Sequence, residues 1–560
     1  MRFHEDDCLR RELLGRIPLA ARVVLDVGCG EGALAADYRR LNPRARIFGI
    51  EYDRRAAAVA APHLDGISRV SVVDEPLPFD IPEGVDCVLH RGVLEHLADP
   101  RDLLLTHAAV LNDDGTILIC LPNPDYWRHQ ERALHGGGTA VEPGPGAMPR
   151  RLSIEAMAAY LGSVGLQLGA VYPVEADAVE AAAFVAAMTP ALLALGIDPQ
   201  AFAARSSPAY FVWCVRKSPL QLLTVAASML APVGGVSHVR IVEPLQAMAT
   251  DPSVITYLSP GGDRDRIDAH SPRIFVLHRP ALNGEEGLVA IRALQRDGWL
   301  IVTEFDDHPD FFEIMRGDGQ FAFTGVHAVQ TSTPVLASLL RLRNPEVAVF
   351  PNAIRALPAS QNFASPDAMT MFFGALNREP DWAPLMSTLN SVASWAGGRL
   401  RFCVLHDRGF FDALETPHKV FTPVCDYEAY LQLLGGCEIS LMPLLDTPFN
   451  RAKSDLKFIE AGACRVVPLA SDIVYAGSIE DGVTGLLFRN ADELRTRLLR
   501  LIAMPHMALD IADAARSHVA EHRMLAYQVA PRIRWYRSLW DRKSELTEAV
   551  ETRLRLAGVG

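Results

Sequence analysis

Apolar residues in the first part of the chain follow two different spacings. Residues 23–27 (VVLDV), 47–50 (IFGI) and 86–89 (DCVL) are short, mostly apolar runs, as expected of buried strands. In the lead-in residues 9–17 and between the runs, apolar positions recur three or four apart, which predicts amphipathic helices. Strands that alternate with helices indicate a doubly wound parallel sheet, and residues 210–215 supply its last strand.

The same alternation restarts at Pro219 and again after an aperiodic stretch at 356–367. We therefore expect an α/β chain of three Rossmann-like units, because 560 residues are too many for one core. The predicted domains are 1–218, 219–360 and 361–560. A final helix is predicted to open at Pro531 and to pack back across the last two units.

Two apolar stretches, 181–197 and 220–236, are shorter than the roughly 20 residues that a membrane-spanning helix needs. Each also contains a proline, Pro190 and Pro232. We interpret each of them as a buried helix or as a connection between domains.

A glycine-rich turn follows the first strand, in the sequence DVGCGEG at 26–32. Glycine permits positive φ and close approach of a ligand to the backbone. A strand, such a turn and a helix N-terminus together form a cofactor site at the carboxyl edge of a parallel sheet. By spacing alone, Gly28, Gly30 and Ala33 also fit the dinucleotide pattern with Glu51 as the ribose-binding acid, so a nicotinamide cofactor stays an alternative.

The order of several motifs resembles class I S-adenosylmethionine-dependent methyltransferases. They are DxGxGxG at 26–32, IFGIE at 47–51, VD at 73–74 and VLEHL at 93–97. The resemblance implies that the glycine turn holds the methionyl part of S-adenosylmethionine and that Glu51 binds the ribose. It also implies that Glu95 and His96 lie where the family closes over cofactor and substrate. The cofactor-binding residues implied are Asp26, Gly28, Gly30, Gly32, Glu51 and Asp74, the last beside the adenine, and the catalytic candidate is His96.

An oxygen or nitrogen nucleophile would need a base during methyl transfer. His90, His96 and His129 are the histidines within this part of the chain that could supply it. Nothing in their spacing chooses among them, and His96 could equally be a histidine that only begins a helix.

The second half resembles GT-B glycosyltransferases, in particular the family 4, or group 1, enzymes. The resemblance rests on VFPN at 349–352, FG at 373–374, the long stretch 449–471 and DGVTGLLF at 481–488. It implies two lobes around a cleft and a nucleotide-diphosphate sugar as the donor substrate.

Positive charge must meet the phosphate charge that develops as the sugar leaves. Arg451 and Lys453 suit this role, and Lys457 follows one turn later on the same predicted helical face. The resemblance implies that Glu460 binds a donor hydroxyl, most simply of the ribose. The family has a second glutamate eight positions earlier, where this chain has Ala452. A second half that binds a glycan or nucleotide sugar without transferring it therefore stays an alternative.

Other candidates lie at predicted turns and strand ends. Gly235, in a second glycine turn ahead of a helix, is a donor-binding candidate. His278 and Asp306 follow predicted strands of the first lobe, and we expect them to line the cleft as catalytic candidates. The acidic stretch 304–308 (EFDDH) is expected to line the cleft as a whole. It is not expected to bind a metal, because carboxylate–metal assistance belongs to the other glycosyltransferase fold.

Composition narrows the setting of these activities. The net charge of −13 argues against binding to nucleic acid. Nine cysteines without a paired spacing and an acidic, charged N-terminus favour a reducing, cytoplasmic compartment. We expect a two-enzyme chain that acts on a glycan or lipid-linked glycan acceptor in surface polysaccharide biosynthesis, and peripheral contact with the inner face of the membrane is compatible with it.

Overall fold

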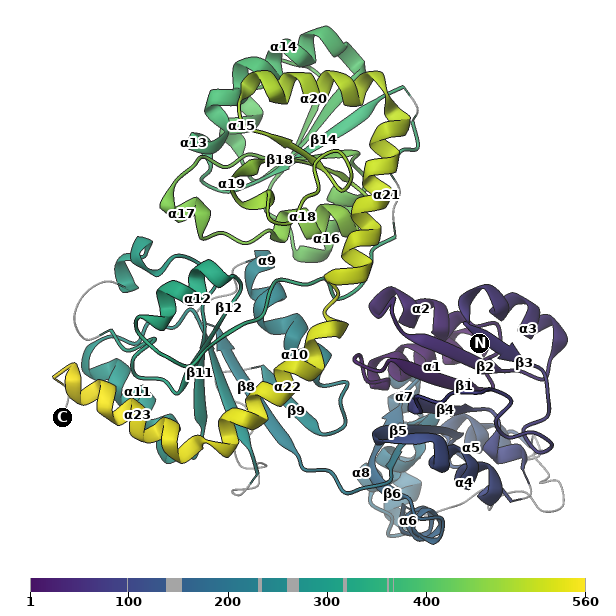
Figure 1. Cartoon of the computed structure of the whole chain (residues 1–560). Coiled ribbons are helices and arrows are strands. Elements are labelled where there is room, and N and C mark those ends of the chain that lie inside the picture. The colour runs from purple at the N-terminus through teal and green to yellow at the C-terminus, as the bar shows by residue number, and fades with distance from the viewer. Residues whose placement is uncertain are drawn as a thin grey trace. The chain divides into compact units, whose positions relative to one another are not determined.

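The computed structural model describes residues 2–97, 99–136, 154–229, 234–258, 271–315, 320–359, 362–365 and 367–558. The chain forms two compact units, which are described separately (Figure 1). One comprises Met1–Gln221 with Thr250–Ser253, and the other comprises Leu222–Ala249 with Val254–Gly560. The predicted boundaries at 218/219 and 360/361 stay predictions.

The first unit is built on a seven-stranded sheet in the order β3-β2-β1-β4-β5-β7-β6. Neighbours from β3 to β5 are parallel, whereas β7 is antiparallel to both β5 and β6. The predicted all-parallel sheet is therefore wrong at its end, because an apolar run does not report the direction of its strand. The strands are β1 (Val23–Val27), β2 (Arg46–Ile50), β3 (Gly66–Ser68), β4 (Val85–Arg91), β5 (Leu111–Pro122), β6 (Gln167–Val174) and β7 (Tyr210–Arg216).

Alternate residues of these strands pack into two hydrophobic cores, one on each face of the sheet. Val24 packs with Leu13 of the lead-in helix and with Tyr38 of α2, whereas Leu25 packs with Leu104 of α4 on the other face. Strand side chains alternate between faces, so a central strand such as β1 contributes to both cores. The helices of this unit are α1 (Arg2–Arg16), α2 (Ala33–Leu41), α3 (Arg54–Ala60), α4 (Arg101–Val110), α5 (Trp127–Leu134), α6 (Ile154–Ser163), α7 (Ala178–Ala194) and α8 (Pro199–Ser206), with short 3-10 turns at Ala61–His63 and Leu94–His96.

Of the two apolar stretches interpreted as buried helices or connections between domains, the first is not buried, whereas the second crosses the boundary between the two units. The first forms α7, but only Ala181 and Leu192 of this helix are buried. In the second stretch, Leu223–Met229 is a strand, β8, and not a helix. A short apolar run does not distinguish a buried helix from a buried strand, and pairing with two neighbouring strands decides the matter.

The first lobe of the second unit has a six-stranded, fully parallel sheet in the order β13-β12-β11-β10-β8-β9. Its strands are β8, β9 (Val254–Leu258), β10 (Arg273–His278), β11 (Leu300–Glu304), β12 (Ala328–Thr331) and β13 (Val347–Val349). Its helices are α9 (Gly234–Ser237), a π-helical turn (His238–Val242), α10 (Glu243–Met248), α11 (Gly284–Arg296) and α12 (Pro334–Arg341), with 3-10 turns at Pro309–Phe311 and Glu313–Met315.

The second lobe repeats the plan with the parallel order β16-β15-β14-β17-β18-β19. Its strands are β14 (Met369–Gly374), β15 (Leu400–Leu405), β16 (Lys419–Thr422), β17 (Ile439–Met442), β18 (Val467–Ser471) and β19 (Leu486–Phe488). Its helices are α13 (Glu379–Trp382), α14 (Met386–Ala396), α15 (Arg408–Ala413), α16 (Tyr427–Gly435), α17 (Pro448–Arg451), α18 (Leu456–Ala463), α19 (Asp472–Tyr475), α20 (Ala491–Ala503) and α21 (Pro505–His522), with 3-10 turns at Ala383–Leu385 and Gly397–Arg399.

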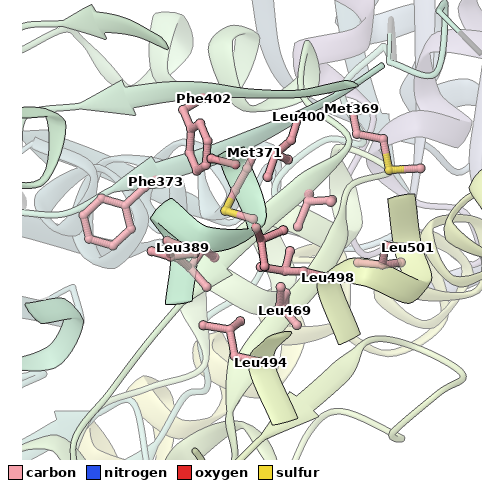
Figure 2. Close-up of a cluster of buried hydrophobic side chains, with 14 of the residues drawn as sticks. Met369, Met371, Phe373, Leu389, Leu400, Phe402, Leu469, Leu494, Leu498 and Leu501 are labelled. Carbon is pink, nitrogen blue, oxygen red and sulfur yellow. The ribbon is translucent and has the colours of Figure 1, made fainter. Parts of the chain in front are cut away.

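One face of this second sheet carries a dense apolar core. Figure 2 shows Met371 and Phe373 of β14 beside Leu389 of α14, with Leu494 and Leu498 of α20 closing the cluster. All five side chains are buried. This core fixes the strand ends from which the site side chains of the lobe project.

The last two helices, α22 (Ala526–Asp541) and α23 (Lys543–Leu556), return to the first lobe (Figure 1). The Tyr536 hydroxyl donates to Gln330 Oε1 at 2.8 Å, and Arg553 Nε donates to the Thr324 carbonyl at 2.9 Å. Pro531 lies inside α22, so the prediction that it opens the helix is wrong. The helix begins earlier because Met524 and Leu525 pair with Ile354 just ahead of it.

Three Rossmann-like units, the last two joined by a returning C-terminal helix, confirm the predicted α/β architecture. Within the described ranges, no helix combines the length and the hydropathy that crossing a bilayer requires.

Candidate functional sites

The glycine turn of the first unit adopts the backbone conformation expected of a ligand cradle. Gly28, Gly30 and Gly32 all have positive φ, at 81°, 57° and 78°. A Cβ on Gly28 would lie 2.1 Å from the Arg91 carbonyl oxygen, whereas a Cβ on Gly30 would meet nothing within 4 Å. Gly28 is thus required by the packing of the turn, whereas Gly30 faces open space.

Glu51 extends from the end of β2 toward this turn. Its Oε2 accepts from the Gly30 N–H and its Oε1 accepts from the Asp53 N–H, both at 2.8 Å. The carboxylate thereby fixes the turn and presents its remaining lone pairs beside it, as a ribose diol would require.

Asp26, at the end of β1, is buried beneath the turn, and its Oδ1 has no hydrogen-bond partner. Burial raises the pKa of this carboxyl, and the nearby Arg91 guanidinium opposes the rise. Arg91 Nη2 lies 3.4 Å from Asp26 Oδ2 and donates to the Cys29 carbonyl at 3.0 Å. An unsatisfied buried carboxylate oxygen at the glycine turn fits a ligand with a cationic group, such as the ammonium of S-adenosylmethionine.

Sequence reasoning did not single out Arg91. Its signal was its place at the end of β4, the strand beside β1, because strand ends of a parallel sheet meet at one edge.

The remaining candidates of the first unit lie at its surface or in its core. His96 and Asp74 are exposed, and so is His129. His90 is buried against His107, with 3.2 Å between their ring nitrogens, and burial lowers the pKa of His90 far below its usual range. A buried neutral histidine of this kind does not suit a base that must reach a substrate. The sequence also offers Ser153 as an N-cap for a helix that follows a glycine- and proline-rich stretch, and this residue lies outside the described residues.

In the second unit, charged side chains gather where β10 and β11 end. Arg279 has a left-handed φ of 48°, and its Nε donates to Asp306 Oδ1 at 2.8 Å. His278 Nε2 lies 3.8 Å from the same oxygen and is buried without a hydrogen-bond partner. Burial alone raises a carboxyl pKa, but the neighbouring His278 and Arg279 outweigh it and lower the pKa of Asp306. The structure therefore brings the two catalytic candidates, His278 and Asp306, together.

Glu304, which precedes these residues, belongs to the interior of the lobe. It forms a two-fold ion pair with Arg240, with both N–O distances at 3.0 Å, and accepts from Gln330 at 2.8 Å. Glu304 and Arg240 are both buried, so a cleft-lining role, which was expected for the whole acidic stretch, is wrong for Glu304.

The cationic candidates of the second lobe differ in their surroundings. Lys453 Nζ lies 2.9 and 2.8 Å from the two carboxylate oxygens of Asp307 in the first lobe. Lys457 Nζ donates to the Gly374 carbonyl at 2.6 Å, and burial lowers the pKa of this amine to about 8. Arg451 is exposed and pairs with Asp446 on the surface.

Lys453 and Lys457 were predicted to share one helical face, and this prediction is wrong. Lys453 lies between α17 and α18, and only Lys457 is helical. The break occurs because Asp455 pairs with Arg523 and accepts from the Ser478 hydroxyl at 2.6 Å, which fixes the start of α18.

Arg378, in the loop after β14, was missed by the sequence analysis. Its Nη1 donates to Asn450 Oδ1 at 2.9 Å and lies 3.2 Å from Asp381. Burial lowers the pKa of both Lys453 and Lys457, and the positive charge of Arg378 lowers it further. The loop follows a strand end directly, and Asn377 in it has a positive φ of 55°, which a sequence does not reveal.

Glu460 and Ala452 are both buried. Glu460 Oε1 accepts from the Tyr427 hydroxyl at 3.0 Å, and Oε2 accepts from the Tyr430 hydroxyl at 2.7 Å. Burial raises the pKa of Glu460 to about 7. Gly235 lies in α9, and a Cβ there would be 3.0 Å from the Tyr427 ring. The side chain of Tyr427 therefore contacts both of these predicted donor-binding residues.

Across the described parts of the chain, no group of three or more His, Cys, Asp or Glu side chains is arranged to hold a metal ion.

Residues 25–117 match the family model described as a methyltransferase domain. The ubiquinone biosynthesis O-methyltransferase of Albidiferax ferrireducens is 30% identical over 127 residues, which are 22% of this chain and 50% of that protein. That of Thiobacillus denitrificans is 32% identical over 126 residues, which are 22% and 53%. The chain spans about half the length of the curated relatives it matches. The prediction of a methyltransferase domain is confirmed over residues 25–117.

Solved glycosyltransferase structures also align with the chain. Anabaena Alr3699/HepE in complex with UDP-glucose is 14% identical with a TM-score of 0.39, covering 56% of this chain and 99% of that one. The sucrose-phosphate synthase of Thermosynechococcus elongatus is 15% identical with a TM-score of 0.42, covering 57% and 99%. The GT-B architecture of the second unit is inferred from its two parallel sheets and from the helices that return to its first lobe.

Proposed function

We propose that this chain is a bifunctional glycan-modifying enzyme. Its first unit is an S-adenosylmethionine-dependent methyltransferase, and its second is a glycosyltransferase that uses a nucleotide-diphosphate sugar. The observation that carries the proposal is the positive-φ glycine turn held by Glu51 inside the matched methyltransferase domain.

In the first unit, bound S-adenosylmethionine supplies an electrophilic methyl group. Asp26 and Arg91 hold the two charged ends of its methionyl part, Glu51 binds the ribose diol, and Asp74 lies beside the adenine. Rate enhancement comes mainly from aligning the nucleophile with the methyl group. The exposed His96 is the base that takes the proton of an oxygen or nitrogen nucleophile.

In the second unit, Lys453, Lys457 and Arg378 neutralise the diphosphate of the donor, and Arg451 reaches it from the surface. The negative charge that develops when the sugar leaves is the charge such cations stabilise. His278 and Asp306 are placed to orient the acceptor hydroxyl and to remove its proton, and the buried, unpartnered His278 Nε2 supports this role.

The acceptor is a glycan or lipid-linked glycan, and the setting is surface polysaccharide biosynthesis in the cytoplasm at the inner face of the membrane. Exposed apolar side chains on and after α7, among them Val179, Leu193 and Leu195, support peripheral contact with that surface. The net charge of −13 disfavours nucleic acid as a partner.

A second candidate keeps the methyltransferase and assigns the other unit a binding role only. Ala452 favours it, because this residue is buried in an apolar cluster where the resembled family has a glutamate. Such a module would hold a glycan or nucleotide sugar without transferring it.

Calorimetric titration of the intact protein with S-adenosylmethionine and with a panel of nucleotide sugars tests both candidates. Two independent binding events, followed by release of nucleoside diphosphate in the presence of an acceptor, are expected for the bifunctional enzyme. Donor binding without turnover would select the second candidate. Binding of NAD in place of S-adenosylmethionine would overturn the assignment of the first unit.

A further inference from the structure

Tyr427 and Tyr430 begin helix α16 and point to one target. Asp426 caps this helix through a 2.8 Å bond from the Ala429 N–H to its Oδ1. The cap fixes the first turn, and residues three apart share a helical face, so both phenols project toward Glu460 of α18. The two rings are stacked with their centroids 5.9 Å apart.

Both oxygens of the Glu460 carboxylate are engaged by these phenols, one by each hydroxyl. Glu460 is only 3% exposed, so little room is left for a further donor. A ribose diol would need the same two oxygens.

Tyr427 also fills the space on the side of the first lobe. Its ring lies 4.9 Å from the His238 ring between centroids and in contact with Gly235. On the other side, the Tyr430 ring packs edge-on against Phe372 of β14, with centroids 5.7 Å apart. Aromatic contacts of this kind hold the two hydroxyls on the carboxylate.

We propose that the second unit binds its donor through the diphosphate and makes no hydrogen bond to the ribose hydroxyls. It therefore accepts 2′-deoxyribonucleoside and ribonucleoside diphosphate sugars alike. The inference rests on the proposed glycosyltransferase function and changes the role expected of Glu460. The cations Lys453, Lys457 and Arg378 carry the affinity, because they contact groups that both donor classes share.

The physical basis is the asymmetry of hydroxyl recognition. A site built to hydrogen-bond a substrate hydroxyl rejects an analogue that lacks it by orders of magnitude, because the polar groups of the site are then left unpaired. Here each oxygen of the buried Glu460 carboxylate already accepts from a tyrosine hydroxyl, so a missing ribose hydroxyl leaves no polar group of the site without a partner.

The test compares matched diphosphate pairs on the full chain by calorimetry: UDP with 2′-deoxy-UDP, and the corresponding pairs of ADP, GDP and CDP. For the base that binds, the two Kd values are expected to agree within about twofold. A preference of about tenfold or more for the ribonucleotide would overturn the inference and leave the proposed function intact. Absence of binding by every pair would overturn the proposed function together with the inference.

A double variant, Tyr427→Phe with Tyr430→Phe, removes both hydroxyls and keeps both rings. It is expected to free Glu460 and to raise the preference for the ribonucleotide several-fold. The matched control is Tyr527→Phe, which removes a phenol that donates to the Ala520 carbonyl between α21 and α22. A ratio that stays near one in the double variant, with an unchanged unfolding temperature, would overturn the shielding role of the tyrosines.

Discussion

Lys453 and Asp307 join the two lobes of the second unit through a two-fold contact, with Nζ 2.9 and 2.8 Å from the two carboxylate oxygens. Asp307 is buried, and Lys453 is largely so. In the proposed function a donor diphosphate competes with this carboxylate for the amine. Donor binding must therefore offset the free energy that is lost when this ion pair breaks.

The first prediction concerns this ion pair. Asp307→Asn is expected to tighten binding of a nucleoside diphosphate about three- to tenfold, a gain of up to about 1.4 kcal/mol, because Lys453 no longer has an anionic partner to leave. Lys453→Met is expected to weaken the same binding tenfold or more. Calorimetry on the intact chain measures both.

Asp412→Asn is the control for the change of charge. It releases Arg408 from an exposed ion pair on α15 and should leave the Kd unchanged. Weaker binding in Asp307→Asn would contradict the competition and would indicate that Asp307 orients Lys453 for the donor.

The second prediction separates two glycines of the first unit. Gly28→Ala is expected to destabilise the protein by more than about 3 kcal/mol, because it combines a left-handed backbone with a clash against the Arg91 carbonyl. Gly30→Ala is expected to cost only about 1 kcal/mol of stability, since only its backbone conformation is strained.

Urea unfolding and titration with S-adenosylmethionine measure the two effects. The methyl group of Gly30→Ala projects into the space assigned to the cofactor, so this variant should stay folded and bind at least tenfold more weakly. Normal affinity in folded Gly30→Ala would place the cofactor elsewhere.

The third prediction concerns Glu51. Glu51→Gln is expected to lower affinity for S-adenosylmethionine about tenfold or more, because an amide offers one acceptor oxygen where the ribose diol needs two. Glu83→Gln provides the control, since Glu83 pairs with Arg46 at the opposite end of the same strand. Equal affinities of the two variants would argue against ribose binding by Glu51.

The fourth prediction concerns pH and the stability of the second unit. Burial raises the pKa of Glu460 to about 7, whereas in the unfolded chain it lies near the ordinary glutamate value of 4.5. Between these values the folded state binds the extra proton, so this group's contribution to stability is present at low pH and is lost as pH rises through about 7.

The free energy of unfolding of wild type minus that of Glu460→Gln is therefore expected to fall between pH 5 and 8. This difference removes the contribution of His107 to the pH dependence of stability. Burial lowers the pKa of His107 to about 4, so its contribution has the opposite sign. Glu428→Gln, which alters an exposed carboxyl on α16, should give a flat difference. A flat difference for Glu460→Gln as well would show that folding does not raise the pKa of the Glu460 carboxyl.

Most of the elements were predictable from local pattern. The run VVLDV forms β1 as expected, and the motif DVGCGEG indicated a cofactor cradle, because a turn of alternating glycines after a buried strand has few other uses. The match of residues 25–117 to a methyltransferase domain agrees with that interpretation. Local pattern did not reveal the direction of a strand or how deeply a helix or side chain is buried. β7 runs antiparallel, α7 is largely exposed and Glu304 is buried.

The sequence by itself determined the three α/β units, the glycine turn and the residue types available for catalysis, since these follow from hydrophobic period and from the chemistry of short motifs. Tertiary structure alone decided the partners. Asp307 meets Lys453 across 146 residues of sequence, and Tyr427 reaches Glu460 across 33. Such pairs form because the folded chain brings together loops and helices that are far apart in the sequence, in the first pair from two different sheets, and no local window of sequence records this.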